Sequence, residues 1–208
     1  MMTMQSYCND PSEVGIDEAG RGSIFGPVMI AGVIWNESYD AIPGSEYIRD
    51  SKTLSPTKRL EMYRWIKQHV KHYSIFAVDN TYVDEYNILE CVYMGINAIV
   101  DEMKPSSIVI DGSNWKSAKI PGVDTITSIV KGDSKYKSIA AASILAKVTH
   151  DKAILKLLKN HTELEKYDLH SNMGYGTKKH YEALRTHGPT EWHRLTFKGV
   201  VNEQGHPS

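Results

Sequence analysis

The sequence predicts an α/β domain with a central mixed five-stranded sheet, flanked by helices and followed by further C-terminal helices. Two observations predict it. Short apolar segments of six to nine residues alternate with longer segments whose apolar residues recur at helical spacing. Strands come first in the chain and then alternate with helices, an order typical of α/β proteins with a mixed sheet.

The predicted strands are apolar segments bounded by turn residues. Residues 27–35 (PVMIAGVIW) are rich enough in Val and Ile to form a central, buried strand. A glycine-punctuated turn, GRGSIFG, precedes this strand. The five strands are expected at residues 14–19, 27–35, 73–79, 106–111 and 125–130.

The predicted helices follow from caps and periodicity. Ser55 is suited to an N-cap, and Pro56 to the first position of the helix that follows. Helical periodicity also runs through 81–103 and stops before Pro105. An Ala-rich segment, 136–159, predicts a long helix, and a short helix is expected at 178–186.

Length and composition bound the class of protein. A chain of 208 residues fits one domain, which we place at 14–198, with a C-terminal helical part from about 160. A flexible N-terminus (1–13) and a tail (199–208) are expected on either side. The two cysteines exclude a disulfide framework and a thiolate metal cage. No apolar segment is long enough to span a bilayer, so we expect a soluble, cytoplasmic protein.

Charge is distributed unevenly along the chain. Residues 1–130 contain 11 basic and 17 acidic side chains, whereas residues 131–198 contain 13 basic and 7 acidic ones. This division is consistent with an acidic site in one half facing an anion-binding surface in the other, or with chance clustering on solvated faces.

Acidic residues end or interrupt several of the predicted strands. Asp17 and Glu18 lie in GIDEAGRG, Asp111 ends IVIDG, and Asp133 follows the fifth strand. Carboxylates that gather at strand ends need a hard cation, and oxygen-only ligation favours Mg²⁺ or Mn²⁺. Adjacent strand residues point to opposite faces, so Asp17 and Glu18 share one metal only if the strand bends there. The alternative for any single acid is a cap or a salt bridge.

Two glycine-containing segments suit nucleic-acid contacts. In Gly20-Arg21-Gly22 the glycines allow close backbone approach and Arg21 can hold a phosphate, although a plain hairpin turn explains the same residues. Tyr175, between two glycines and beside basic residues, suits stacking on nucleic acid, or is a buried core tyrosine.

The segment 131–148 combines basic residues with a predicted helix. Lysines surround Asp133, and Ser143 and Lys147 share a helix face.

Six segments together resemble the ribonuclease HII family, in its bacterial form. They run in family order over almost the whole chain, and the combination is specific although each piece alone is weak. The segments are GIDEAGRGSIFGPV (15–28), DSKTLS (50–55), IVIDGSNW (108–115), KGDSKYKSIAAASILAKV (131–148), MGYGTKKH (173–180) and GPTEWHRLTF (188–197).

The resemblance implies a ribonuclease H-like fold and a site that binds two Mg²⁺ or Mn²⁺ ions during catalysis. The family's four catalytic, metal-binding carboxylates fall on Asp17, Glu18, Asp111 and Asp133. Substrate-binding residues are expected at Gly20, Arg21, Gly22, Lys52, Ser143, Lys147 and Tyr175, and the C-terminal helical part, about 160–198, is expected to bind substrate. The implied activity is hydrolysis of RNA in RNA–DNA hybrids and cleavage 5′ to ribonucleotides in duplex DNA, leaving 5′-phosphate and 3′-hydroxyl ends.

Some features bear on this expectation. His150 stands where the family usually has Arg, whereas Arg21 argues against the sister family, ribonuclease HIII, which usually has Lys there. We expect a monomer with a nucleic-acid partner, no membrane and no obligate protein partner. The rival interpretations are another nuclease of the ribonuclease H superfamily, such as a junction resolvase, and a catalytically silent hybrid-binding module.

Overall fold

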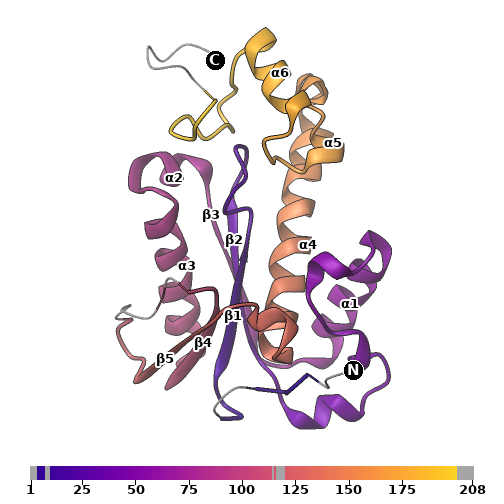
Figure 1. The fold of residues 1–208 in the computed structure, drawn as a ribbon, viewed down its shortest axis with the longest axis vertical. Coiled ribbons are helices and arrows are strands. Elements are labelled where there is room, and N and C mark those ends of the chain that lie inside the picture. The colour runs from indigo at the N-terminus through magenta and orange to yellow at the C-terminus, as the bar shows by residue number, and fades with distance from the viewer. Residues whose placement is uncertain (1–3, 8–9, 114, 116–119, 201–208) are drawn as a thin grey trace.

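Five strands form one mixed sheet in the spatial order β3-β2-β1-β4-β5 (Figure 1). The computed structural model describes residues 4–7, 10–113, 115 and 120–200. Neighbouring strands differ in direction: β1–β2 and β2–β3 are antiparallel, whereas β1–β4 and β4–β5 are parallel. The predicted mixed five-stranded sheet is confirmed. Its strands are β1 (Val14–Ala19), β2 (Val28–Ile34), β3 (Tyr73–Val78), β4 (Ser107–Asp111) and β5 (Thr125–Ile129).

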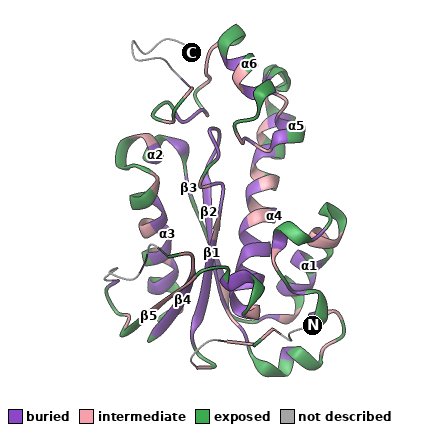
Figure 2. Cartoon of the chain, viewed as in Figure 1, coloured by how far each residue is buried: buried purple, intermediate pink, exposed green. Residues whose placement is uncertain are grey.

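Helices cover both faces of the sheet. On one face α4 lies against β1 and β2 with α1 packed beside it, and on the other face α3 packs on β2 and β3 (Figure 1). Figure 2 shows the central strands and the adjoining part of α4 as the buried layer. The helices are α1 (Pro56–His69), α2 (Asn80–Tyr86), α3 (Ile88–Met103), α4 (Lys137–Asn160), α5 (Leu169–Asn172) and α6 (Lys178–His187).

The single helix predicted over residues 81–103 is wrong, because the chain breaks it at Asn87. Asn87 has φ = +69°, a conformation that ends α2. Its side-chain oxygen then accepts hydrogen bonds from the backbone amides of Leu89 and Glu90, at 2.9 and 3.2 Å, and so caps α3. The apolar periodicity continues across this break, which is why the sequence pattern does not reveal it.

A third apolar cluster joins the C-terminal helical part to the β1–β2 connection. Ile24 and Phe25 of that connection pack with Ile154 of α4, with Tyr167 and with Leu184 of α6. The region predicted to bind substrate is thereby fixed to the loop that leaves β1.

The segment before β1 is hydrogen-bonded to the domain where the structure describes it. The amide of Gln5 donates to the carbonyl of Lys135 at 2.9 Å, and the Ser6 hydroxyl donates to Asp40 at 2.6 Å. Most of the tail predicted at 199–208 lies outside the described residues, and the predicted domain boundaries remain predictions. Among the described helices, none combines the length and apolar character needed to cross a bilayer.

Candidate active site

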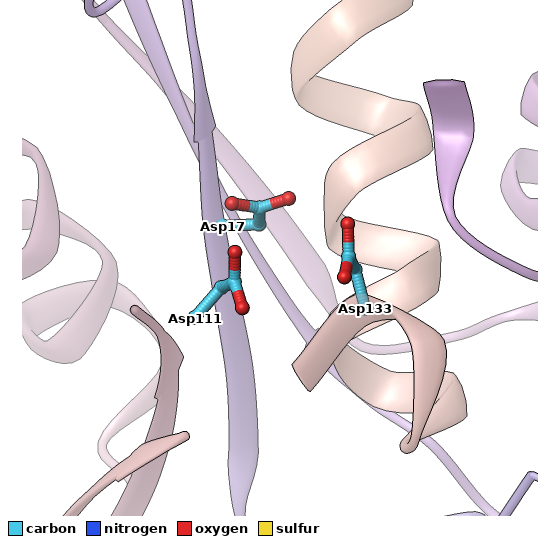
Figure 3. Close-up of side chains that lie close together, drawn as sticks. All are labelled: Asp17, Asp111 and Asp133. Atoms are coloured by element: carbon cyan, nitrogen blue, oxygen red, sulfur yellow. The ribbon is translucent and has the colours of Figure 1, made fainter. Parts of the chain in front are cut away.

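Three carboxylates that are far apart in the sequence meet beside the sheet. Asp17 lies in β1, Asp111 ends β4, and Asp133 lies in a 3₁₀ turn just before α4. One oxygen from each of the three lies within 4.8 Å of the others (Figure 3). The parallel pairing explains the first two: Ile16 is in register with Ile110, so the next residue of each strand faces the same side of the sheet.

The peptide backbone and small residues hold the cluster together. The amide of Gly132 donates a hydrogen bond to Oδ1 of Asp111 at 2.7 Å. A Cβ on Gly132 would lie 2.5 Å from Cδ1 of the buried Ile139, so that side chain would have to shift. Gly15 has the same role in β1, since a Cβ on it would lie 2.5 Å from the backbone of Ser138. These glycines let α4 and its preceding turn approach β1 closely enough for the carboxylates to meet.

Ser143 lies behind the cluster and is buried. Its hydroxyl is hydrogen-bonded to the hydroxyl of Ser51 at 2.9 Å, and its polar interaction with Asp17 acts to lower the pKa of that carboxyl. Ser143 thus lies where it can orient Asp17, and its contact with substrate remains a prediction.

Burial and mutual repulsion make the cluster unstable as a set of bare anions. Burial, followed by the charges of Glu18 and Asp111, raises the pKa of Asp17 well above its usual range. Burial and the charge of Asp111 raise the pKa of Asp133 to about 6. A divalent cation held by oxygen ligands alone would neutralise these charges, so the donor set fits Mg²⁺ or Mn²⁺.

The ammonium group of Lys52 faces this negative charge. Partial burial acts to lower its pKa, but the carboxylates of Asp17 and Asp133 outweigh burial, and the pKa of Lys52 is raised. Lys52 therefore stays charged beside the cluster, within the field of its carboxylates.

The metal-free protein is expected to lose stability as the pH rises through the titration of Asp133. Because the folded-state pKa of Asp133 is raised to about 6, the folded chain binds a proton that the unfolded chain releases near pH 4. The free energy of unfolding therefore falls between about pH 4 and pH 6. Urea titrations with EDTA should show this slope in the wild type and a shallower one in Asp133→Asn. Equal slopes in the two proteins would contradict the assignment.

Glu18 lies next to the cluster but is not one of the three converging carboxylates. The β1–β2 pairing keeps an unbroken register through Asp17 and Glu18, so the two side chains leave opposite faces of the strand. Glu18 instead pairs with Arg21 at 3.2 Å. Burial raises the pKa of Glu18 against the opposing charge of Arg21, and the charge of Asp111 contributes. Its assignment as a metal ligand remains a prediction.

The Gly20–Gly22 turn and Tyr175 lie against each other at the end of β1. Gly20 has φ = +84°, and its amide donates to the hydroxyl of Tyr175 at 3.3 Å. Ser23, just after the turn, forms a β-bridge with Tyr175. A Cβ on Gly22 would meet no atom within 4 Å, so this side of the turn is open.

Lys147 extends from α4 toward the same tyrosine. Its Nζ lies 5.1 Å from the centre of the Tyr175 ring and donates to Asp151 at 2.8 Å. His150, one helical turn further along α4, is buried, and its ring lies 5.9 Å from that of Tyr175. Glycine at position 20 leaves room for this imidazole. The structure thus places Gly20, Gly22, Lys147 and Tyr175 together, as the sequence interpretation requires for a common surface.

Sequence reasoning missed Arg194 as a member of this region. Its guanidinium is buried and donates to the carbonyls of Gly20 at 2.7 Å and Gly26 at 3.0 Å. The segment that contains it, GPTEWHRLTF, carries part of the family resemblance, but Arg194 itself was not predicted as a site residue. A buried arginine has no periodic signature, so the sequence offered no means to single it out.

Comparison with known protein families gives a consistent result. The family model described as Ribonuclease HII matches residues 14–200. The ribonuclease HII of Rickettsia prowazekii is 42% identical over 186 residues, which cover 88% of this chain and 90% of that protein. The ribonuclease HII of Clostridioides difficile is also 42% identical, over 88% of this chain and 68% of that protein.

Solved structures show the same fold. Ribonuclease HII of Archaeoglobus fulgidus, in a structure of its complex with PCNA, superimposes with a TM-score of 0.71 at 26% identity, covering 90% of this chain and 95% of that chain. Ribonuclease H2 of Pyrococcus horikoshii gives 0.69 at 25% identity, covering 90% and 94%. Bst-RNase HIII in complex with Mn²⁺ gives 0.71 at 19% identity, covering 91% and 68%, a likeness of fold alone.

Proposed function

The chain belongs to the ribonuclease HII family of metal-dependent ribonucleases H, and from this premise we propose that it cuts RNA strands in RNA–DNA hybrids and also duplex DNA at embedded ribonucleotides. Cleavage on the 5′ side of the ribonucleotide would leave a 5′-phosphate and a 3′-hydroxyl. The observation that carries this proposal is the cluster of three converging carboxylates, two of them buried, on the same domain as an open glycine turn hydrogen-bonded to Tyr175.

The residues at the cluster suit divalent metal ions. Asp17, Asp111 and Asp133 would hold Mg²⁺ or Mn²⁺, with Glu18 completing the set and two ions present during catalysis. Such ions supply an activated water and stabilise the leaving oxygen in an in-line displacement. The chain's own contribution is to fix the three carboxylates on β1, β4 and the turn before α4, and to keep the charge of Lys52 beside them.

Selectivity for ribonucleotides needs groups other than the metal ligands. The phosphodiester is the same in RNA and DNA, whereas the 2′-hydroxyl differs and is both a donor and an acceptor. The open side of Gly22 allows backbone groups to approach a sugar, and Arg21 supplies charge for a phosphate. Tyr175 would pack on the neighbouring deoxyribose and so read the junction between the two sugar types.

All three converging carboxylates come from one chain, so the site needs no second subunit. We therefore propose that the protein acts as a monomer, and that it works in the cytoplasm, where a bacterial chromosome lies. No membrane and no obligate protein partner enter this proposal.

A cleavage assay on four substrates tests the proposed function. We expect Mg²⁺- or Mn²⁺-dependent cutting of an RNA–DNA hybrid and of a DNA duplex with one ribonucleotide, and no cutting of all-DNA or all-RNA duplexes. Cleavage of the all-DNA duplex would instead support a DNA-directed nuclease. Binding of the hybrid without cleavage, with EDTA and metal giving the same result, would indicate a silent binding module.

Alanine at Gly20 and alanine at Gly22 are expected to have different effects, although the residues are two positions apart. Gly20→Ala forces a side chain into the left-handed region and against His150, and should destabilise the protein by about 2 kcal/mol. Gly22→Ala meets open space at negative φ, so stability should stay within about 0.5 kcal/mol of wild type. The proposed function predicts that Gly22→Ala raises KM for both substrates, because the methyl group obstructs backbone approach.

Urea unfolding and steady-state kinetics of the two variants check this prediction. A stable Gly22→Ala protein with wild-type KM would show that the substrate does not approach this side of the turn.

A further inference from the structure

Two histidines of the C-terminal part form a buried pair beside the Tyr175 loop. His180 lies in the first turn of α6, and His193 lies in the segment that pairs with Phe25. Both rings are buried, and their Nε2 atoms are 3.1 Å apart. Two nitrogens at this distance share one proton, so one imidazole donates and the other accepts.

The neighbours of His193 decide which ring donates. The amide N–H of Thr190 donates to Nδ1 of His193 at 2.9 Å, so this nitrogen is an acceptor without a proton. Burial, and then the charge of His180, lower the pKa of His193 to about 3, so the ring is neutral near pH 7. The single proton of neutral His193 is therefore on Nε2, which donates to His180.

The hydrogen bonds of His180 have the same direction: this ring accepts from His193 and donates to Tyr175. Its Nε2 accepts from His193, so its own proton is on Nδ1, which lies 3.1 Å from the backbone carbonyl of Tyr175 and donates to it. Burial lowers the pKa of His180, which keeps this ring neutral as well. The hydrogen bonds thus run in one direction, from Thr190 through both imidazoles to Tyr175.

Arg194, the residue after His193, is hydrogen-bonded to the Gly20–Gly22 turn and to the segment that follows it. Arg194 donates from its guanidinium to the carbonyls of Gly20, Arg21 and Gly26, at 2.7, 3.3 and 3.0 Å. Its backbone amide donates to the carbonyl of Ile24 at 2.9 Å. The dipeptide His193-Arg194 is therefore hydrogen-bonded to the glycine turn directly, through Arg194, and to the Tyr175 loop indirectly, through His180.

We propose that His180 and His193 are positioning residues for ribonucleotide recognition, whose oriented hydrogen-bond chain, together with Arg194, sets Tyr175 relative to the Gly20–Gly22 turn. This inference rests on the proposed function, because it assigns these residues to the recognition that Tyr175 performs. It places the histidines behind the tyrosine, out of contact with the substrate.

Two substitutions at His180 separate positioning from mere packing. Asparagine places an NH₂ near the position of Nδ1 and keeps the bond to the Tyr175 carbonyl, but it loses the bond to His193. Glutamine places an oxygen near the position of Nε2 and keeps the bond from His193, but it loses the bond to Tyr175. Glutamine is the larger side chain, so His180→Gln should be the more stable of the two variants.

The measured quantity is the ratio of kcat/KM for a DNA duplex with one ribonucleotide to kcat/KM for a uniform hybrid. This ratio does not depend on the fraction of enzyme that is folded. We expect His180→Asn to keep the ratio within about threefold of wild type and His180→Gln to lower it about tenfold, opposite to their order in thermal stability. His187→Gln, on the exposed side of the same helix, is the control and should change neither quantity.

If the kcat/KM ratio follows thermal stability, with His180→Asn the more affected variant, the histidines only pack. Equal ratios in both variants and wild type would also overturn the proposal.

Should neither variant fold, long-range ¹H–¹⁵N spectra of the wild-type protein decide. They should show the Nε2–H tautomer at His193 and the Nδ1–H tautomer at His180 near pH 7. The reverse tautomers, or a protonated ring, would overturn the proposal. Absence of metal-dependent cleavage in the wild type would instead contradict the proposed function itself, whatever the tautomers.

Discussion

Asp111→Asn is expected to lower metal-dependent cleavage by at least about a thousandfold while leaving hybrid binding largely intact. Losing one carboxylate ligand removes several kcal/mol of transition-state stabilisation, and each 1.4 kcal/mol is about tenfold in rate. Asparagine keeps the oxygen that accepts the 2.7 Å hydrogen bond from Gly132, so the fold around the site is preserved. The phosphate contacts that the proposed function expects from basic side chains are not altered by this substitution.

The same substitution should stabilise the metal-free protein. The charge of Asp111 raises the pKa of both Asp17 and Asp133, so its removal relieves repulsion in a buried cluster. In Asp111→Asn, single-turnover cleavage should therefore fall, hybrid binding in EDTA should stay near that of wild type, and the thermal unfolding temperature of the metal-free protein should rise. The control is Asp101→Asn, an exposed carboxylate on α3, which should match wild type in all three measurements. Full activity of Asp111→Asn would contradict its assignment as a metal ligand.

The fold and the three converging carboxylates could be predicted because they depend on patterns that the sequence displays. Alternating apolar segments predict strands, and strand ends gather at one edge of a sheet, so the sequence alone indicates that Asp17 and Asp111 converge, as they do in the structure. The break at Asn87 could not be predicted in this way, because a single residue at positive φ leaves the surrounding periodicity intact.

The face of a long helix is harder to assign from sequence. Ser143 and Lys147 share a face of α4, but one is buried behind Asp17 and the other lies beside the Tyr175 ring. Which part of that face meets the sheet depends on the close approach at Gly15. Residues such as Arg194 and the His180–His193 pair act through backbone carbonyls and each other, and such partners have no spacing in the sequence that reveals them.

Tyr175→Ala is expected to remove most of the preference for a single ribonucleotide in DNA and to lower the rate as well. The ring of Tyr175 is half-buried, with its hydroxyl accepting from the Gly20 amide and its face toward the Nζ of Lys147. Aromatic stacking in nucleic-acid complexes contributes about 1–3 kcal/mol, so the lost ring corresponds to roughly tenfold to a hundredfold in kcat/KM. The loss should be larger for the embedded ribonucleotide than for the uniform hybrid, since only the former places a deoxyribose beside the ribose.

Tyr175→Phe distinguishes the ring from its hydroxyl. Phenylalanine keeps the stacking surface but loses the 3.3 Å bond from the Gly20 amide, so its substrate preference should lie between those of wild type and Tyr175→Ala. Tyr47→Ala, an exposed tyrosine away from the turn, is the control and should keep the wild-type preference. If Tyr175→Ala cuts the embedded-ribonucleotide duplex with wild-type kinetics and preference, the ring only packs against its neighbours. Recognition of the junction would then have to be assigned to other groups, of which the Gly20–Gly22 turn, with Arg21, and Lys147 lie next to the ring.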